Sequence, residues 1–263
     1  MNKGIGALIF PVFVAGIVAL SIWGPESLSR YQDKQIFGAV HQQEAGLTGE
    51  GYRYTLSANE KLLLLARALD SQKRWESGQN GANFVLIVNH RGPSEGEISQ
   101  QEIYEVCNEQ LEALKKLEVL PEEVREVDPE LYDAVLYSAI DAREPRNHLA
   151  VWRVSLSSSL RNVNKENRLI DAYIDAENGK IYEFYTRINH DWEDMDPDSM
   201  MKGWSGYIGL AGMEPCENGN PLTEATPNVK KYVFSGAEGE TETITLGFYD
   251  GIRELFISVS SGR

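Results

Sequence analysis

Apolar side chains recur at helical spacing in two stretches of the chain, and each stretch follows a Ser-x-x-Glu capping box. The boxes are residues 57–60 and 99–102, where the Ser and Glu side chains satisfy free N–H groups of the first helical turn. The first pattern predicts a helix that ends near Ser71, and the second predicts a helix that Pro121 stops. The second helix is apolar on one side only, so it must lie on another apolar surface. A sheet formed by the strands that follow is the nearest candidate.

Runs rich in Ile, Val, Tyr and Phe alternate with Gly, Asn and Pro clusters elsewhere, as in antiparallel strands joined by short loops. Residues 133–140 fit either a strand or a helix, and the alternation of Val135 and Tyr137 favours the strand. The expected strands are residues 84–88, 133–140, 149–156, the two arms of 168–186, 229–234, 243–248 and 252–259. These patterns together predict an α+β fold in which helices pack on antiparallel β-sheets.

The strongest turn signal is Asn178-Gly179, in the middle of residues 168–186. A two-residue loop would mix apolar and acidic side chains on each face of the hairpin. A three-residue loop, residues 177–179 with Gly179 left-handed, separates an apolar face from a face turned to water, so we prefer it. This register pairs Ile174 with Tyr182 and Ala172 with Phe184. The acidic residues of the solvent-facing side are then Asp171, Asp175 and Glu183.

The order of elements before and within this hairpin carries a family resemblance. A helix is followed by a strand with Trp152-x-Val154 and then by Tyr-Ile-Asp-Ala-x-x-Gly-Lys-Ile at residues 173–181. In this respect residues 99–186 resemble the PepSY domain, although residues 121–141 are inserted between the helix and the Trp-x-Val strand. PepSY domains are small non-catalytic α+β modules of metallopeptidase propeptides and of membrane-anchored extracytoplasmic bacterial proteins. The resemblance therefore implies a binding module, with regulation of a peptidase as its usual proposed role.

The composition changes after Tyr185 to the acidic run 189–198, which predicts an internal boundary. We expect a larger PepSY-like α+β domain at residues 57–190 and a smaller α+β unit at residues 191–263. In the smaller unit, Asp196 is expected to cap a short helix that has Pro197 at its first position. A two-residue turn at Asp250-Gly251 predicts the pairs Leu246 with Leu255 and Ile244 with Ile257.

The N-terminal stretch of residues 4–23 contains no charged side chain and is long enough to cross about 30 Å of hydrocarbon. Lys3 precedes it, and the positive-inside rule places that end in the cytoplasm. We expect residues 1–24 to form one transmembrane helix and residues 25–56 to form a juxtamembrane lead. The protein would then be a single-pass protein of the cell membrane with most of its chain extracytoplasmic. The alternative is a signal peptide, whose cleavage would secrete the remainder.

The net charge of −15 disfavours nucleic acid as a partner, because an acidic surface repels phosphates. Asp194-x-Asp196-x-Asp198 has the alternating spacing of a calcium loop, but Ser199 stands where the sharp turn requires Gly. The chain contains no His-Glu-x-x-His pair and no phosphate-binding loop. We therefore predict no metal site, no cofactor and no catalytic residues. Whether the chain is an enzyme stays open, and a non-catalytic role is favoured.

Acidic and aromatic side chains of the hairpin form the candidate binding surface, because aromatic residues beside charges are typical of interfaces. The same composition is also typical of cross-strand pairs without a partner. The candidate residues are Asp171, Tyr173, Asp175, Glu183 and Tyr185. We expect an extracytoplasmic binding or regulatory module that acts on an envelope or membrane protein, such as a peptidase. The alternatives are a hydrolase with dispersed catalytic carboxylates and a structural subunit of a membrane complex.

Overall fold

The structure is a computed structural model of the 263-residue chain. It describes residues 56–78, 83–90, 92–145, 147–159, 163–216, 228–236 and 239–261, all within the compact unit Tyr54–Arg263. The expected transmembrane segment and the juxtamembrane lead up to residue 55 lie outside these ranges. Among the described helices, none is both long and apolar enough to cross a membrane.

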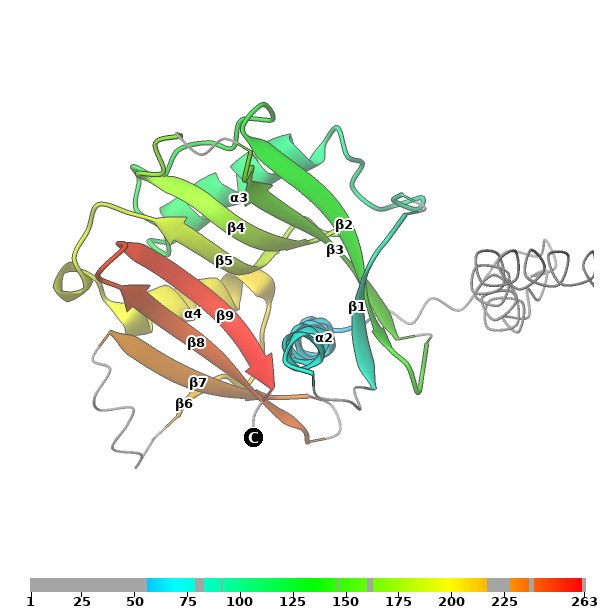
Figure 1. Ribbon diagram of the computed structural model, residues 1–263. Coiled ribbons are helices and arrows are strands. Elements are labelled where there is room, and N and C mark those ends of the chain that lie inside the picture. Colours follow the sequence, from blue (N-terminus) through cyan, green and yellow to red (C-terminus); the bar gives the residue numbers. More distant parts are fainter. Residues whose placement is uncertain are drawn as a thin grey trace, which may run out of the picture. The chain divides into compact units, whose positions relative to one another are not determined.

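Within the described ranges, nine strands form one antiparallel sheet in the order β1-β2-β3-β4-β5-β9-β8-β7-β6 (Figure 1). The strands are β1 (Phe84–Val88), β2 (Tyr132–Asp141), β3 (His148–Leu156), β4 (Arg168–Asp175), β5 (Ile181–Arg187), β6 (Glu214–Pro215), β7 (Val229–Ser235), β8 (Thr241–Tyr249) and β9 (Glu254–Ser261). The helices are α2 (Ala58–Glu76), α3 (Ile103–Lys116), α4 (Pro197–Ile208) and the short 3-10 helix η1 (Trp192–Asp194). The predicted α+β class, with helices on antiparallel strands, is confirmed. Residues 133–140 lie in a strand, as favoured.

The sheet curves around α2. This helix contacts β1, β2, β3 and β9. In the strand order β1 is first and β9 is sixth, so in a flat sheet they would lie about 24 Å apart. A helix is only about 10–12 Å wide, so α2 can touch both strands only if the sheet bends toward it. Figure 1 shows α2 end-on between β1 and β9, on the concave face.

Helices α3 and α4 contact each other and lie behind the strands, on the side away from α2 (Figure 1). The apolar stripe expected for α3 is buried at Ile103, Cys107, Leu111 and Leu114, which confirms that this helix packs on an apolar surface. In α4, the indole N–H of Trp204 donates to the carbonyl oxygen of Ile181 on β5 at 3.2 Å. The sheet is therefore a central layer with a helix on its concave face and two on its convex face.

Helices α2 and α4 begin where the sequence indicates, whereas α3 begins only at Ile103, and its N-cap Glu102 makes no side-chain capping bond. At the start of α2 the backbone N–H of Ser57 donates to the Glu60 carboxylate at 2.7 Å, and the Glu60 N–H donates to the Ser57 hydroxyl at 3.3 Å. Asp196 caps α4, and Pro197 occupies the first turn, as predicted. The first helix runs past Ser71 to Glu76, because no helix-breaking residue stands in this interval.

The β4–β5 hairpin has the predicted left-handed glycine, but its loop is longer than the predicted residues 177–179, because the Asp175 N–H donates to the Lys180 carbonyl oxygen at 2.9 Å and leaves residues 176–179 between them. Gly179 has φ of 75°, in the left-handed region, and Ala172 pairs with Phe184 as expected. The expected pair of Ile174 with Tyr182 is wrong, because Ile174 pairs with Ile181 across a β-bulge. The bulge leaves Tyr182 as the extra residue, and its side chain turns toward the face that carries Asp175.

The β8–β9 hairpin differs from its predicted register by two residues. Leu246 pairs with Ile257 and Ile244 with Val259, and the turn is longer than two residues because Tyr249 already pairs with Glu254. Arg253 closes this turn with φ of 54°. A shift of two residues keeps every side chain on its own face, so the expected core residues stay in the core.

The stretches 57–190 and 191–263 share the sheet that the described residues form. Strand β9 pairs with β5, so Phe184 of the first stretch lies opposite Ile257 of the second. All of the described residues fall in the compact unit Tyr54–Arg263. The composition change near residue 190 therefore marks a connection between strands of the same sheet.

Candidate functional site

The concave face of the sheet carries the residues that the sequence singled out. The register places Arg153 opposite Tyr173, Tyr173 opposite Glu183, and Tyr185 opposite Phe256, so these side chains share one face. We distinguish two groups on it. The inner cluster consists of Lys61, Asp175, Glu177 and Tyr182. The aromatic band consists of Arg153, Asp171, Tyr173, Tyr185, Tyr249 and Phe256.

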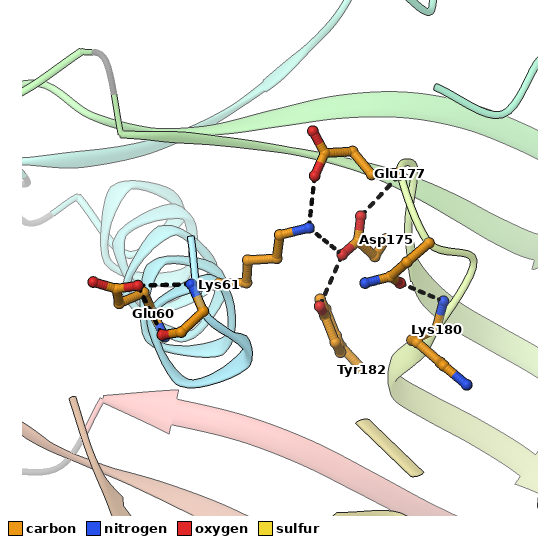
Figure 2. A network of polar contacts seen from close by, with 8 residues as sticks. Glu60, Lys61, Asp175, Glu177, Lys180 and Tyr182 are labelled. Atoms are coloured by element: carbon orange, nitrogen blue, oxygen red, sulfur yellow. Dashed lines mark hydrogen bonds and ion pairs between the residues drawn. The ribbon is translucent and has the colours of Figure 1, made fainter. Parts of the chain in front are cut away.

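The inner cluster joins α2 to the end of the β4–β5 hairpin (Figure 2). The Lys61 ammonium donates to Asp175 at 2.8 Å and to Glu177 at 2.7 Å. Asp175 also accepts the hydroxyl of Tyr182 at 2.8 Å and the backbone N–H of Glu177 at 2.8 Å. Since the Asp175 side chain is fully buried, these contacts replace the water that its charge requires.

This pairing determines how the inner cluster titrates. Burial alone would lower the pKa of Lys61, but the hydrogen bonds to Asp175 and Glu177 outweigh it and raise that pKa above its ordinary value. Burial next to Asp175 also raises the pKa of the Tyr182 phenol. Lys61 therefore stays charged and Tyr182 stays neutral at physiological pH. The inner cluster is an ion-pair network that fixes α2 on the sheet.

Glu183 lies on the same face and lacks an ion-pair partner among the described residues. Its side chain accepts the backbone N–H of Val259 at 3.0 Å, and the residue is 4% exposed. Burial raises the pKa of this carboxyl to about 7, although the Val259 hydrogen bond and the charge of Lys73 act in the opposite direction.

Arg153 and Asp171 form the polar part of the aromatic band. The guanidinium donates to both carboxylate oxygens, from Nε at 3.0 and 3.1 Å and from Nη2 at 2.7 Å. The same guanidinium lies over the ring of Tyr173, 5.8 Å from its centroid. Such a bidentate, stacked arginine is held in one orientation.

Tyr185, Phe256 and Tyr249 form the aromatic part of the band, across β5, β9 and β8. The ring of Phe256 stacks on Tyr185 at 5.4 Å and on Tyr249 at 4.7 Å between centroids. Gly247 lies opposite Phe256, and an added Cβ there would come within 2.5 Å of the Phe256 ring. The absence of a side chain at Gly247 thus lets the Phe256 ring lie flat over β8.

The predicted site residues are placed together but are not equally open. Asp171 and Tyr185 keep part of their surface exposed, whereas Tyr173 is 7% exposed. The expectation that Asp175 and Glu183 face water is wrong, because both are buried, Asp175 against Lys61 of α2 and Glu183 against Val259 of β9. A hairpin sequence alone contains no information about a helix that lies on its polar face.

Several residues of the two groups were missed from the sequence. Lys61 had a detectable signal, since it stands four residues before Leu65 and seven before Ala68, both fully buried. A lysine on an apolar helical stripe indicates a buried ion pair. Arg153, Phe256 and Tyr249 had no comparable signal, because their meeting depends on strand neighbours that are distant in the sequence.

The described residues offer little to a metal or to covalent chemistry. They contain no group of three His, Cys, Asp or Glu side chains arranged to hold a metal ion. In the calcium-like motif, Asp196 caps α4 and Asp198 binds Lys230 at 2.8 Å. Cys107 is a buried free thiol, and burial raises its pKa to about 12, which keeps it protonated.

A groove of about 500 Å³ lies along α3, away from the predicted residues. Its lining residues are Gln101, Tyr104, Glu105, Asn108, Glu109, Glu112, Glu126, Val127 and Pro129. None of the five predicted site residues contributes to this groove, so the concave face remains the candidate site.

Comparison with known proteins finds no relative of this chain. No protein-family model, no curated protein and no solved structure matches the chain. The resemblance to the PepSY domain stays a prediction from sequence, and the function has to be argued from the site itself.

Proposed function

We propose that this chain is a non-catalytic binding module that recognises a polypeptide partner with the aromatic band on the concave face of its sheet. Together with the apolar stretch of residues 4–23, the proposal places the module at the outer side of a bacterial membrane, with an envelope protein as its partner. A peptidase is the first class of partner to test, because the PepSY resemblance implies one.

The row of ordered aromatic and charged side chains across β3, β4, β5, β9 and β8 carries the proposal. Tyr185 lies opposite Asp171 on one side and opposite Phe256 on the other, so the ion pair and the ring stack are continuous. The row ends at Tyr249, which is 51% exposed. Tyrosine and arginine dominate interface energetics, and side chains that are already held in place lose little entropy when a partner binds.

The hydrolase alternative finds less support among the described carboxylates. A hydrolase needs an acid or base that a substrate can reach. Asp175 is fully buried and bound to Lys61, and Glu183 is only 4% exposed. Both carboxylate oxygens of Asp171 already accept hydrogen bonds from Arg153. In the observed conformation these groups stabilise the fold and position the aromatic band.

The test compares partner recovery by the full chain and by two surface variants. The tagged full chain is solubilised from its native membrane after mild cross-linking, and the proteins bound to it are identified. Tyr249→Ser removes the exposed end of the aromatic band. Leu117→Ser is the matched control, because Leu117 is 44% exposed but lies at the end of α3, on the other side of the sheet.

We expect the parent chain and Leu117→Ser to recover the same envelope protein and Tyr249→Ser to recover it at least fivefold less. Equal recovery by all three chains would show that the aromatic band is not the binding surface. Circular dichroism of both variants must match the parent, so that a loss of binding is not a loss of fold.

A further inference from the structure

Strand β1 is an open edge of the sheet. It pairs with β2 on one side, and no described strand lies on its other side. The hydrogen bonds at its ends fix which backbone groups face β2. The N–H of Asn89 donates to Leu136 at 2.8 Å, and the carbonyl oxygen of Asn83 accepts from Ala142 at 2.6 Å.

The alternation of an antiparallel ladder determines the direction of the residues between these two bonds. Residues 83, 85, 87 and 89 direct their backbone groups to β2, so Phe84, Leu86 and Val88 direct theirs away from it. No described residue forms a hydrogen bond to these outward N–H and C=O groups. They are three regularly spaced donors and three acceptors along the outer side of β1.

The opposite edge of the sheet is protected, whereas β1 is not. At that edge β6 has only two residues, and one of them is Pro215, which lacks an N–H. Short edge strands, prolines and charged side chains are the common devices that prevent pairing with another chain. Strand β1 is Phe-Val-Leu-Ile-Val and has neither charge nor proline. Ile87 on one face is 49% exposed and Val88 on the other is 40% exposed.

These properties indicate which kind of polypeptide segment could pair with β1. An added strand would bond to Phe84, Leu86 and Val88 through its backbone, and apolar side chains next to Ile87 and Val88 would cover their exposed surface. The chain carries a net charge of −15, and Asp141 lies directly opposite Phe84. A second copy of the chain would bring the same excess of negative charge, whereas a segment flanked by Lys or Arg is attracted.

We propose that β1 binds an extended, apolar segment of the partner protein, flanked by basic residues, which adds to the sheet as a further antiparallel strand. The inference rests on the proposed function, because the segment belongs to the same polypeptide partner. It adds a second contact that recognises backbone rather than side chains. The aromatic band and the edge would then act on different parts of that partner.

The probe is a synthetic peptide in which Val and Thr alternate between two pairs of Lys, and the same peptide with Glu in place of Lys is its control. Binding to the full chain in detergent is measured together with amide hydrogen exchange. We expect the Lys peptide to slow exchange of the Phe84, Leu86 and Val88 amides at least tenfold. The Val85 and Ile87 amides, already bonded to β2, should change less than twofold. The Glu peptide should bind at least tenfold more weakly.

Two variants at one position separate backbone recognition from packing. Leu86→Pro removes an outward N–H without touching the bonds to β2, and Leu86→Ala loses a similar amount of side chain but keeps the N–H. We expect at least tenfold weaker peptide binding for Leu86→Pro and less than threefold for Leu86→Ala. If Leu86→Pro does not fold, Ile87→Lys replaces it, since a lysine on the exposed edge repels the Lys peptide.

Three outcomes would overturn the inference. The first is peptide binding without protection of the outward amides. The second is protection that grows with protein concentration when no peptide is present, which assigns the edge to a second copy. The third is a loss of peptide binding in Tyr249→Ser with the edge amides unprotected, which supports the aromatic band and removes β1. Conversely, the peptide could protect the β1 edge amides while Tyr249→Ser recovers as much partner as the parent chain. This result would exclude the aromatic band as the binding surface and support β1.

Discussion

The carboxyl of Glu183 makes the stability of the fold depend on pH. The side chain is buried and accepts a hydrogen bond from the Val259 N–H, while burial raises its pKa to about 7. Its ordinary pKa is about 4.3, so between these two values the folded chain holds a proton that the unfolded chain has released. The resulting stabilisation is fully present below about pH 4.3 and is lost as the pH rises through 7.

We predict that Glu183→Gln removes this pH dependence. The full shift corresponds to about 4 kcal/mol of unfolding free energy at most. Urea unfolding of both chains should therefore show that the parent loses about 2–3 kcal/mol relative to the variant between pH 5 and pH 8. The amide keeps an oxygen that accepts the Val259 N–H, so the variant should fold. Parallel pH profiles of the two chains would contradict the raised pKa.

At the residue scale, the sequence does not predict the burial of side chains that contact an element distant in the chain. The sequence indicates that Gly179 is left-handed, because the turn conformation depends on neighbours in the chain. The burial of Asp175 depends on Lys61 of α2, which lies more than a hundred residues earlier, and Glu183 contacts Val259 of β9, more than seventy residues later. Lys61 was the available signal, since a buried lysine requires a buried acid.

At the scale of elements, the β4–β5 hairpin is fixed by its turn and by α3. Gly179 has φ of 75°, and an added Cβ would come within 2.7 Å of Val106 on α3. The glycine is therefore required both by the backbone of the turn and by the close approach of the helix. In the β8–β9 hairpin, Gly247 is required only by a close approach, that of the Phe256 ring.

We predict that Gly179→Ala costs more stability than Gly209→Ala. Gly209 is the matched control, because it has φ of 77° at the end of α4 but no atom within 4 Å of an added Cβ. The left-handed backbone costs an alanine about 1–2 kcal/mol of stability in either variant. In Gly179→Ala the contact with Val106 costs about 1–3 kcal/mol more. Thermal or urea unfolding gives both values. Equal losses in the two variants would mean that α3 moves away without cost.

At the scale of the whole molecule, local patterns predict elements but leave strand neighbours open. The capping box of α2, the left-handed Gly179 and the strand at 133–140 all follow from residues close in sequence. The pairing of β5 with β9 joins segments about seventy residues apart, and the curvature of the sheet arises because α2 touches both β1 and β9. No periodic pattern in the sequence indicates the β5–β9 pairing or the curvature. The boundary near residue 190 was therefore predicted from the composition change alone.

The shared sheet predicts a single cooperative unfolding transition for the unit Tyr54–Arg263. Helix α2 contacts β1, β2 and β3 as well as β9, and Arg67 binds Glu240 and Glu242 before and within β8. Neither half can lose its strands without exposing the apolar surface that the other half covers. Far-ultraviolet circular dichroism and tryptophan fluorescence should therefore change at the same urea concentration. The tryptophans report on both stretches, since Trp152 lies in β3 and Trp204 in α4.

A cut in the chain would test the same point more strongly. We expect cleavage by a protease in the connection after Ile188 to leave both fragments associated, because β5 and β9 remain paired through Tyr185 and Phe256. Two separated transitions, or fragments that part without denaturant, would instead assign residues 57–190 and 191–263 to independent folding units. The aromatic band would then span an interface between two units, and Phe256→Ala would weaken their association as well as the proposed binding.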